Sequence, residues 1–156
     1  MDVFYWLIAG GIVAVAVAAL AIPWLVRRRR LAQLSQARQL FHQQRERLEA
    51  RFLDMAANSG RPRGLAWTNC DFEDEITFAH DRSTGELTAL VGVTISFEAV
   101  EGGGMEEVEA VGNLRAATAV FRYRASGWAT DGRAIFNLEP NEAVEHFRGT
   151  LERIAE

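Results

Sequence analysis

The chain contains no lysine, a single cysteine and only three prolines, so all 17 basic residues are arginines. One cysteine, Cys70, cannot form an internal disulfide, and the chain therefore needs no oxidising compartment to fold. No histidine or second cysteine stands at metal-ligand spacing, and no Walker or dinucleotide-binding motif occurs. The sequence predicts no cofactor and no metal site built on histidine or cysteine.

Charge is absent from Val3 to Val26, a run of 24 residues that ends at Arg27-Arg28-Arg29-Arg30. A helix of this length spans about 36 Å and can cross a hydrocarbon core of about 30 Å. The run predicts a transmembrane helix over residues 1–26. A cleaved signal peptide is the alternative, because Ala19-Leu20-Ala21 resembles a cleavage site, but the segment before the run carries no positive side chain.

The arginines after the run predict an orientation, because arginines beside a span stay on the cytoplasmic side. We expect a single-pass protein of the inner (cytoplasmic) membrane, with its C-terminal domain in the cytoplasm. The lipid bilayer is the first expected partner, and the membrane-surface residues are Arg27, Arg28, Arg29 and Arg30. Small residues on one face of the span, Gly10, Ala14 and Ala18, would also support a homodimer.

Residues 27–60 predict a basic stalk helix, which the segment Asn58 to Pro62 brings to an end. Apolar residues recur every seven positions at Leu34, Phe41, Leu48 and Met55. A coiled coil needs a second apolar position in each heptad, and that position is apolar only at the ends of the segment. We therefore expect this stripe to pack on the sheet of the chain's own domain, with a coiled coil as the alternative.

Charge separates the stalk from the rest of the chain. Residues 27–63 hold ten arginines against three acids, a balance of +7, and residues 64–156 hold seven arginines against 17 acids, a balance of −10. Binding to phosphate backbones requires a basic surface, which the distal part lacks. Nucleic acid is therefore excluded as a partner of the distal part.

Residues 61–156 predict an α+β domain. In Leu87–Ala99 the odd positions are all apolar, which indicates a strand with one buried face. Further strands are expected around residues 76–79, 117–123 and 128–138, with a short extra strand at 65–70, and residues 81–85 suit a hairpin loop. A last helix is expected from Pro140, with an apolar stripe at Val144, Phe147, Leu151 and Ile154.

The order of these elements is a long helix, four or five antiparallel strands and a short helix. It predicts a curved antiparallel sheet with helices on one face. This is the cystatin-like or nuclear-transport-factor-2-like plan, and the likeness rests on element order alone.

Five glutamates flank the loop Gly102-Gly103-Gly104, and their carboxylates would repel a phosphate. These candidate binding residues are Glu98, Glu101, Glu106, Glu107 and Glu109. Their spacing matches no EF-hand. We expect a docking patch for a basic partner, another protein; a solvated loop and a Ca²⁺ or Mg²⁺ site are the alternatives.

No catalytic residue is assigned. His80 and Asp81 are adjacent in a predicted strand, so their side chains should point to opposite faces rather than form a pair. Cys70 has no histidine near it in the sequence. The sequence thus favours a non-enzymatic, membrane-anchored interaction or scaffold domain; the alternative is a small-molecule-binding or catalytic pocket domain of the nuclear-transport-factor-2-like type.

The stretches 94–106, 109–121 and 132–138 (TISFEAVEGGGME, EAVGNLRAATAVF and GRAIFNL) resemble an uncharacterised group of bacterial single-pass membrane proteins. The resemblance covers roughly residues 61–150. It carries no assigned activity or site, so it implies nothing about chemistry.

Overall fold

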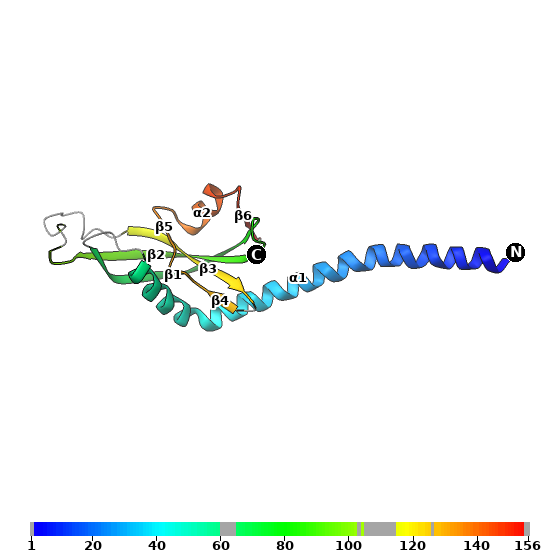
Figure 1. The fold of residues 1–156 in the computed structure, drawn as a ribbon, viewed down its shortest axis with the longest axis horizontal. Coiled ribbons are helices and arrows are strands. Elements are labelled where there is room, and N and C mark those ends of the chain that lie inside the picture. Colours follow the sequence, from blue (N-terminus) through cyan, green and yellow to red (C-terminus); the bar gives the residue numbers. More distant parts are fainter. Residues whose placement is uncertain (1, 60–64, 103, 105–114, 126, 155–156) are drawn as a thin grey trace. The chain divides into compact units, whose positions relative to one another are not determined.

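The computed structural model describes residues 2–59, 65–102, 104, 115–125 and 127–154 (Figure 1). The chain divides into two compact units, Met1–Gln39 and Leu40–Glu156, and each is described by itself. The elements in chain order are α1 (Asp2–Ser59), β1 (Leu65–Asp81), β2 (Leu87–Ala99), β3 (Arg115–Arg124), β4 (Gly127–Ala129), β5 (Ala134–Phe136), α2 (Pro140–His146) and β6 (Leu151–Arg153).

The expected span and stalk are parts of one helix, α1, which continues through Pro23 and past the four arginines. The side chains of residues 2–16, 18, 26, 27, 29 and 30 lie outside the described ones. In the part of the chain that is described, no helix is long and apolar enough to cross a membrane. The transmembrane character of residues 1–26 therefore stays a prediction.

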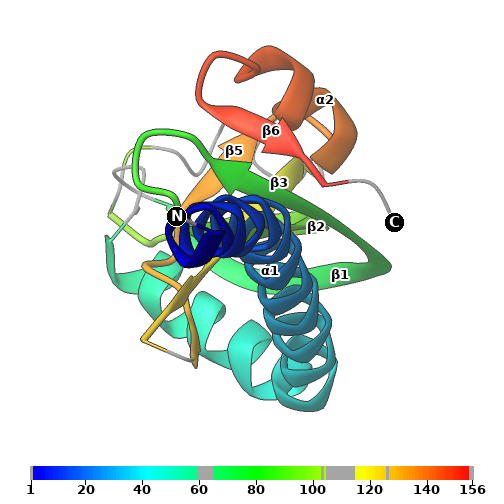
Figure 2. The same ribbon diagram turned by 90° about the vertical axis from the view of Figure 1, so that its right-hand side faces the viewer.

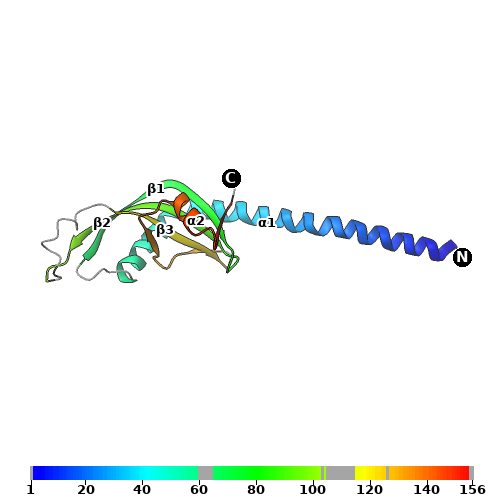
Figure 3. The same ribbon diagram turned by 90° about the horizontal axis from the view of Figure 1, so that it is seen from above.

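The second unit is an α+β domain with a curved antiparallel sheet, as expected. Five of its six strands follow the order β4-β3-β2-β1-β6, and the sixth, β5, pairs with β3 on the same edge as β4. Figure 3 shows β1, β2 and β3 side by side in this sheet. The hairpin between β1 and β2 is confirmed: Asp81 Oδ1 accepts hydrogen bonds from the backbone N–H groups of Ser83 (2.8 Å) and Thr84 (3.3 Å), and Gly85 supplies a φ of 71°.

The face of the sheet toward α1 is filled by aromatic rings. Phe41 and Phe52 of α1 are 1% and 0% exposed. Both contact Phe121 of β3, at ring-centroid distances of 5.3 Å and 5.9 Å. Phe97 is buried on the same face, against Trp67. The helix stripe therefore packs on the domain's own sheet, as expected for residues 40–59.

The buried stripe of α1 departs from the strict seven-residue repeat near its end. Phe41 and Leu48 are buried as expected, but Phe52 and Ala56 follow them, while Met55 is 38% exposed. A straight helix has 3.6 residues per turn, so a seven-residue repeat drifts around its surface. Near the end of α1 the side that packs on the sheet is therefore formed by Phe52 and Ala56 instead of Met55.

Helices lie on both faces of the sheet, and the expectation of helices on one face is wrong. In Figure 2 the end of α1 that belongs to this unit, residues 40–59, lies below the strands and α2 lies above them. Ala143 and Val144 of α2 share a buried cluster with Leu90 and Val120. These two strand residues are cross-strand partners on the face opposite Phe121. Strand β2 is thus buried on both faces along its first half, rather than on one.

The last helix is shorter than its apolar stripe suggested. Strand β6 replaces the expected helical turn and pairs with the end of β1, with Leu151 opposite Asp81. Gly149 weakens helix propagation at this point, and β6 supplies hydrogen-bond partners to the edge of β1. Leu151 is buried all the same, because it joins the cluster of Leu90 and Val120.

Candidate functional site

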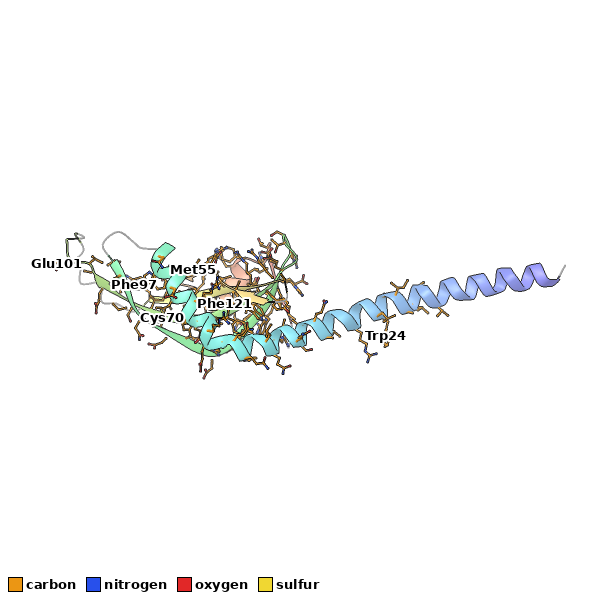
Figure 4. All side chains as sticks on the ribbon, turned by 60° about the horizontal axis from the view of Figure 1, so that its bottom comes forward. Trp24, Met55, Cys70, Phe97, Glu101 and Phe121 are labelled. Atoms are coloured by element: carbon orange, nitrogen blue, oxygen red, sulfur yellow. The ribbon has the colours of Figure 1, made fainter. Side chains whose placement is uncertain are left out.

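Only part of the expected acidic docking patch can be located. Glu98 lies near the end of β2, Glu101 follows it, and both are exposed (Figure 4). The other three candidates, Glu106, Glu107 and Glu109, lie outside the described residues. In the part of the chain that is described, no three acidic, histidine or cysteine side chains are grouped so that they could hold a metal ion.

Of the membrane-surface candidates, Arg28 alone has a described side chain; those of Arg27, Arg29 and Arg30 lie outside the described residues. Arg28 is exposed, and its guanidinium lies 5.4 Å from the ring centroid of Trp24.

Asp71 to Glu75 contain four acidic residues, and this acidic run forms a bulge in β1. Phe72 pairs with Val93 and Ile76 pairs with Val91, so three residues of β1 stand opposite Gly92. The Glu73 carboxylate lies over Gly92, in space that a Cβ atom would occupy. Absence of a side chain at this position is therefore what lets the bulge close.

Arg45 of α1 holds this bulge. Its guanidinium donates hydrogen bonds to the backbone carbonyls of Glu73 and Asp74, the latter at 2.9 Å. Its Nε also donates to Glu49 Oε1, one helical turn away, at 2.7 Å. The acidic run therefore has a structural role, because its backbone carbonyls connect β1 to α1 through Arg45; it does not form a ligand-binding cluster.

The candidate nucleophile and base are not assembled for catalysis. Burial, with a smaller contribution from Asp71, raises the pKa of the Cys70 thiol to about 11, so the thiol is protonated at neutral pH. Hydrogen bonds from Ser83 hold the pKa of Asp81 below its usual value, and Thr84 and Arg122 act in the same direction. Asp81 Oδ1 accepts hydrogen bonds from its own turn, and among the described residues no hydrogen bond joins Asp81 to His80.

A cleft of about 260 Å³ opens between the sheet and the segment that joins α2 to β6. Its floor is apolar, and its rim carries two guanidinium groups, one carboxylate and two hydroxyl groups. The lining residues are Asp81, Thr88, Leu90, Val120, Arg122, Arg133, Ile135, Phe147, Thr150 and Leu151. The cleft lies on the α2 side of the sheet, away from the aromatic core.

Strand register explains how these side chains converge. Thr88 pairs with Arg122 and Leu90 pairs with Val120, so the four residues form a two-by-two block on one face of β2 and β3. The wall opposite the block comes from Phe147, Thr150 and Leu151.

The loop between β4 and β5 fixes the backbone of Arg133, which supplies the second guanidinium group. The Thr130 hydroxyl donates to the carbonyl of Val120 (2.9 Å) and accepts from the Gly132 N–H (3.1 Å). The Arg133 carbonyl accepts from the Val120 N–H at 3.1 Å. Arg133 therefore projects from a loop that is tied to β3 on both sides of its turn.

The two arginines differ in their partners. Arg122 forms an ion pair with Asp131 at 3.2 Å, and its side chain is 26% exposed. Among the described residues, the guanidinium of Arg133 has neither an ion-pair nor a hydrogen-bond partner. Arg133 is exposed to solvent, and the carboxylate of Asp81 lines the same cleft, so the rim carries charges of both signs.

The sequence interpretation did not identify this cleft. Leu90 was the available signal, since it is apolar at an even position of a strand whose other even positions are mostly polar. Together with Val120 it indicates a second covered face. Convergence of Arg133 and Thr150 on that face depends on the β4–β5 loop and on β6, which the apolar pattern did not indicate.

Comparisons of the chain with protein-family models, with curated proteins and with solved structures gave no match.

Proposed function

We propose that the chain is a membrane-anchored, non-enzymatic interaction domain that faces the cytoplasm from the inner membrane. The observation that carries the proposal is the exposed apolar surface of α1. Between residues 17 and 25, five large apolar side chains are 45% to 77% exposed: Val17, Leu20, Ile22, Trp24 and Leu25. Figure 4 marks Trp24 on this part of the helix.

These side chains surround the helix rather than forming a stripe. Successive residues are rotated by about 100° in an α-helix, so Ile22, Trp24 and Leu25 point in three different directions. A helix with apolar residues all round needs an apolar environment on every side. A bilayer provides this environment, whereas one packed face of a soluble domain does not.

The arginines at the end of this segment support the orientation. The contact between Arg28 and Trp24 suits the lipid interface, where an aromatic ring lies at headgroup depth and a cation lies beside anionic lipid. The four arginines would keep residues 31–156 on the cytoplasmic side.

The surface that contacts a protein partner is proposed to be the acidic segment at the end of β2. Glu98 and Glu101 are exposed there, and Val100 between them is 44% exposed. An exposed apolar side chain between two carboxylates suits a partner that offers basic and apolar groups together. We extend the patch to Glu106, Glu107 and Glu109 on the sequence alone.

A pocket domain is the second candidate function, and the cleft on the α2 face favours it. The packing of α1 on one face of the curved sheet is the arrangement of the cystatin-like or nuclear-transport-factor-2-like plan, and we retain that plan as part of this proposal. The rings of Phe41, Phe52 and Phe121 fill the space between α1 and the sheet, so a ligand would have to bind on the other face.

The test of the anchor uses topology reporters on the full-length chain. A reporter active only in the cytoplasm, fused after Glu156, should be active, and the fusion should stay with membranes after a carbonate wash. Replacing Arg27 to Arg30 by glutamine should reduce the cytoplasmic fraction, because these charges set the orientation. The matched control replaces Arg47 and Arg51 of α1. Activity from a periplasm-only reporter at the same position would contradict the orientation, and release by carbonate would contradict the anchor.

A further inference from the structure

The cleft on the α2 face holds polar groups without partners, and the interaction proposal does not use them. Thr88 is 3% exposed, and its hydroxyl forms no hydrogen bond with a described residue. Thr150, at the rim of the same cleft, is exposed, so water can supply its hydrogen-bond partner. A buried hydroxyl without a partner loses hydrogen-bond energy unless a ligand or water supplies one. The buried Thr88 hydroxyl and the guanidinium of Arg133, an exposed residue, line one cleft.

The charged residues at the rim of the cleft indicate what net charge a ligand should have. Asp131 neutralises Arg122, and Arg133 remains as a cation that no described residue pairs with. Asp81 also lines the cleft, and its carboxylate would repel a dianion such as phosphate. With Asp131 counted, the rim carries two positive and two negative charges, so a ligand with one negative charge fits it better than a ligand with two.

The floor indicates the rest of the ligand. Leu90, Val120, Ile135 and Leu151 present hydrocarbon, and Phe147 adds an aromatic ring. Sites for drug-sized ligands measure about 300–1,000 Å³. A cleft of about 260 Å³ is smaller than that range and suits one ring or a short hydrocarbon chain.

We propose that the cleft binds a small organic monocarboxylate, with its carboxylate at Arg133 and its apolar body on Leu90, Val120 and Ile135. A planar guanidinium matches a carboxylate through two parallel hydrogen bonds. Thr88 donates a further hydrogen bond from the strand. The inference rests on the pocket candidate above and does not depend on the membrane anchor.

The test is calorimetric titration of the full-length protein in detergent micelles, with benzoate as the probe. Benzamide has the same ring without the charge, and inorganic phosphate tests the other anion chemistry; micelles without protein correct for partitioning. Benzoate should bind saturably and about tenfold or more tightly than benzamide, because a charge-assisted pair is lost with the amide.

Variants locate the bound probe. Arg133→Gln should weaken benzoate binding about tenfold or more, and Thr88→Val should weaken it by a smaller factor. Arg153→Gln is the matched control, because it removes an exposed arginine of β6 that does not line the cleft. Thermal unfolding of each variant, without probe, establishes that the domain is folded.

Three outcomes would overturn the inference. Equal affinity for benzamide and benzoate would leave a pocket but remove its preference for carboxylates. Tighter binding of phosphate would assign the cleft to another class of anion. If benzoate did not bind saturably, or if the Arg133 and Arg153 variants lost the same amount of affinity for it, the cleft would not be a carboxylate-binding site.

Discussion

Replacement of Gly132 by alanine should be among the most damaging single-methyl changes in the domain. Gly132 has a φ of 75°, in the left-handed region that side chains disfavour. A Cβ atom there would lie 2.6 Å from the carbonyl carbon of Met55 and 2.8 Å from its Cβ. The loop between β4 and β5 therefore approaches α1 as closely as the absence of a side chain allows.

The expected cost has two parts. The left-handed backbone costs an alanine about 1–2 kcal/mol. Pressing a methyl group against the α1 backbone costs about 1–3 kcal/mol more, because the atoms that it meets are main-chain and Cβ atoms. We expect Gly132→Ala to lower the free energy of unfolding by about 2–5 kcal/mol.

Two other glycines separate these contributions. Gly85 has a φ of 71°, and no atom lies within 4 Å of the place that a Cβ would take, so Gly85→Ala should show the backbone cost alone. Gly149 has the same open space without a positive φ, so Gly149→Ala should be neutral or stabilising by up to about 1 kcal/mol. Truncation of Met55 to alanine should not rescue Gly132→Ala, because every atom that the new methyl meets would remain.

Urea unfolding of the full-length protein, followed by tryptophan fluorescence, measures these differences, since Trp128 is 7% exposed and reports on the core. If Gly132→Ala were no more damaging than Gly85→Ala, the close contact between the loop and α1 would be refuted. A rescue by Met55→Ala would show that the side chain, rather than the backbone, sets the limit.

Three further changes test other parts of the structure. Phe121→Ala should cost about 3–5 kcal/mol in the same unfolding assay, because Phe121 is fully buried between Phe41 and Phe52; a loss below about 1 kcal/mol would mean that the strand phase is wrong. Arg45→Met should cost about 1–3 kcal/mol, because it removes the charge-assisted hydrogen bonds from the guanidinium to the exposed bulge carbonyls of Glu73 and Asp74; Arg47→Met, on the exposed face, is the control. Alkylation of Cys70 by iodoacetamide at pH 8 should be about a hundredfold slower in the folded than in the unfolded chain, since the folded pKa is about 11 against 9.0; equal rates would contradict that shift.

The sequence was a good guide wherever burial follows a simple period. The odd positions of Leu87–Ala99 are apolar because one face of β2 packs under α1, and the structure confirms that phase. The α+β class and the hairpin before Leu87 were predictable for the same reason, because both depend on local pattern and turn chemistry. In each case the residues that determine the structure lie close together in the sequence.

Features that depend on distant pairing were not predictable. Leu151 is apolar in helical register with Val144, yet it lies in a strand because the edge of β1 supplies its partner. Residues 71–75 are an acidic run in the sequence, and only the pairing of Phe72 with Val93 and of Ile76 with Val91 shows that they form a bulge. The arginines of the cleft come from β3 and from the β4–β5 loop, so their convergence appears only once the strands are in register.

The bulge in β1 has a consequence for how copies of the chain meet one another. On the side of β1 away from β2, only Ala79–Asp81 pair with another described strand, β6. Residues 65–77 of β1 therefore present an unpaired strand edge. An unpaired edge is a template for another chain, and extended edges of this kind lead to aggregation. Here the bulge interrupts the regular spacing of the edge, Arg45 occupies two of its carbonyls, and the exposed carboxylates of Asp74 and Glu75 would meet the same charges on a second copy. Two copies of the domain that meet at this edge would therefore not join their sheets into one.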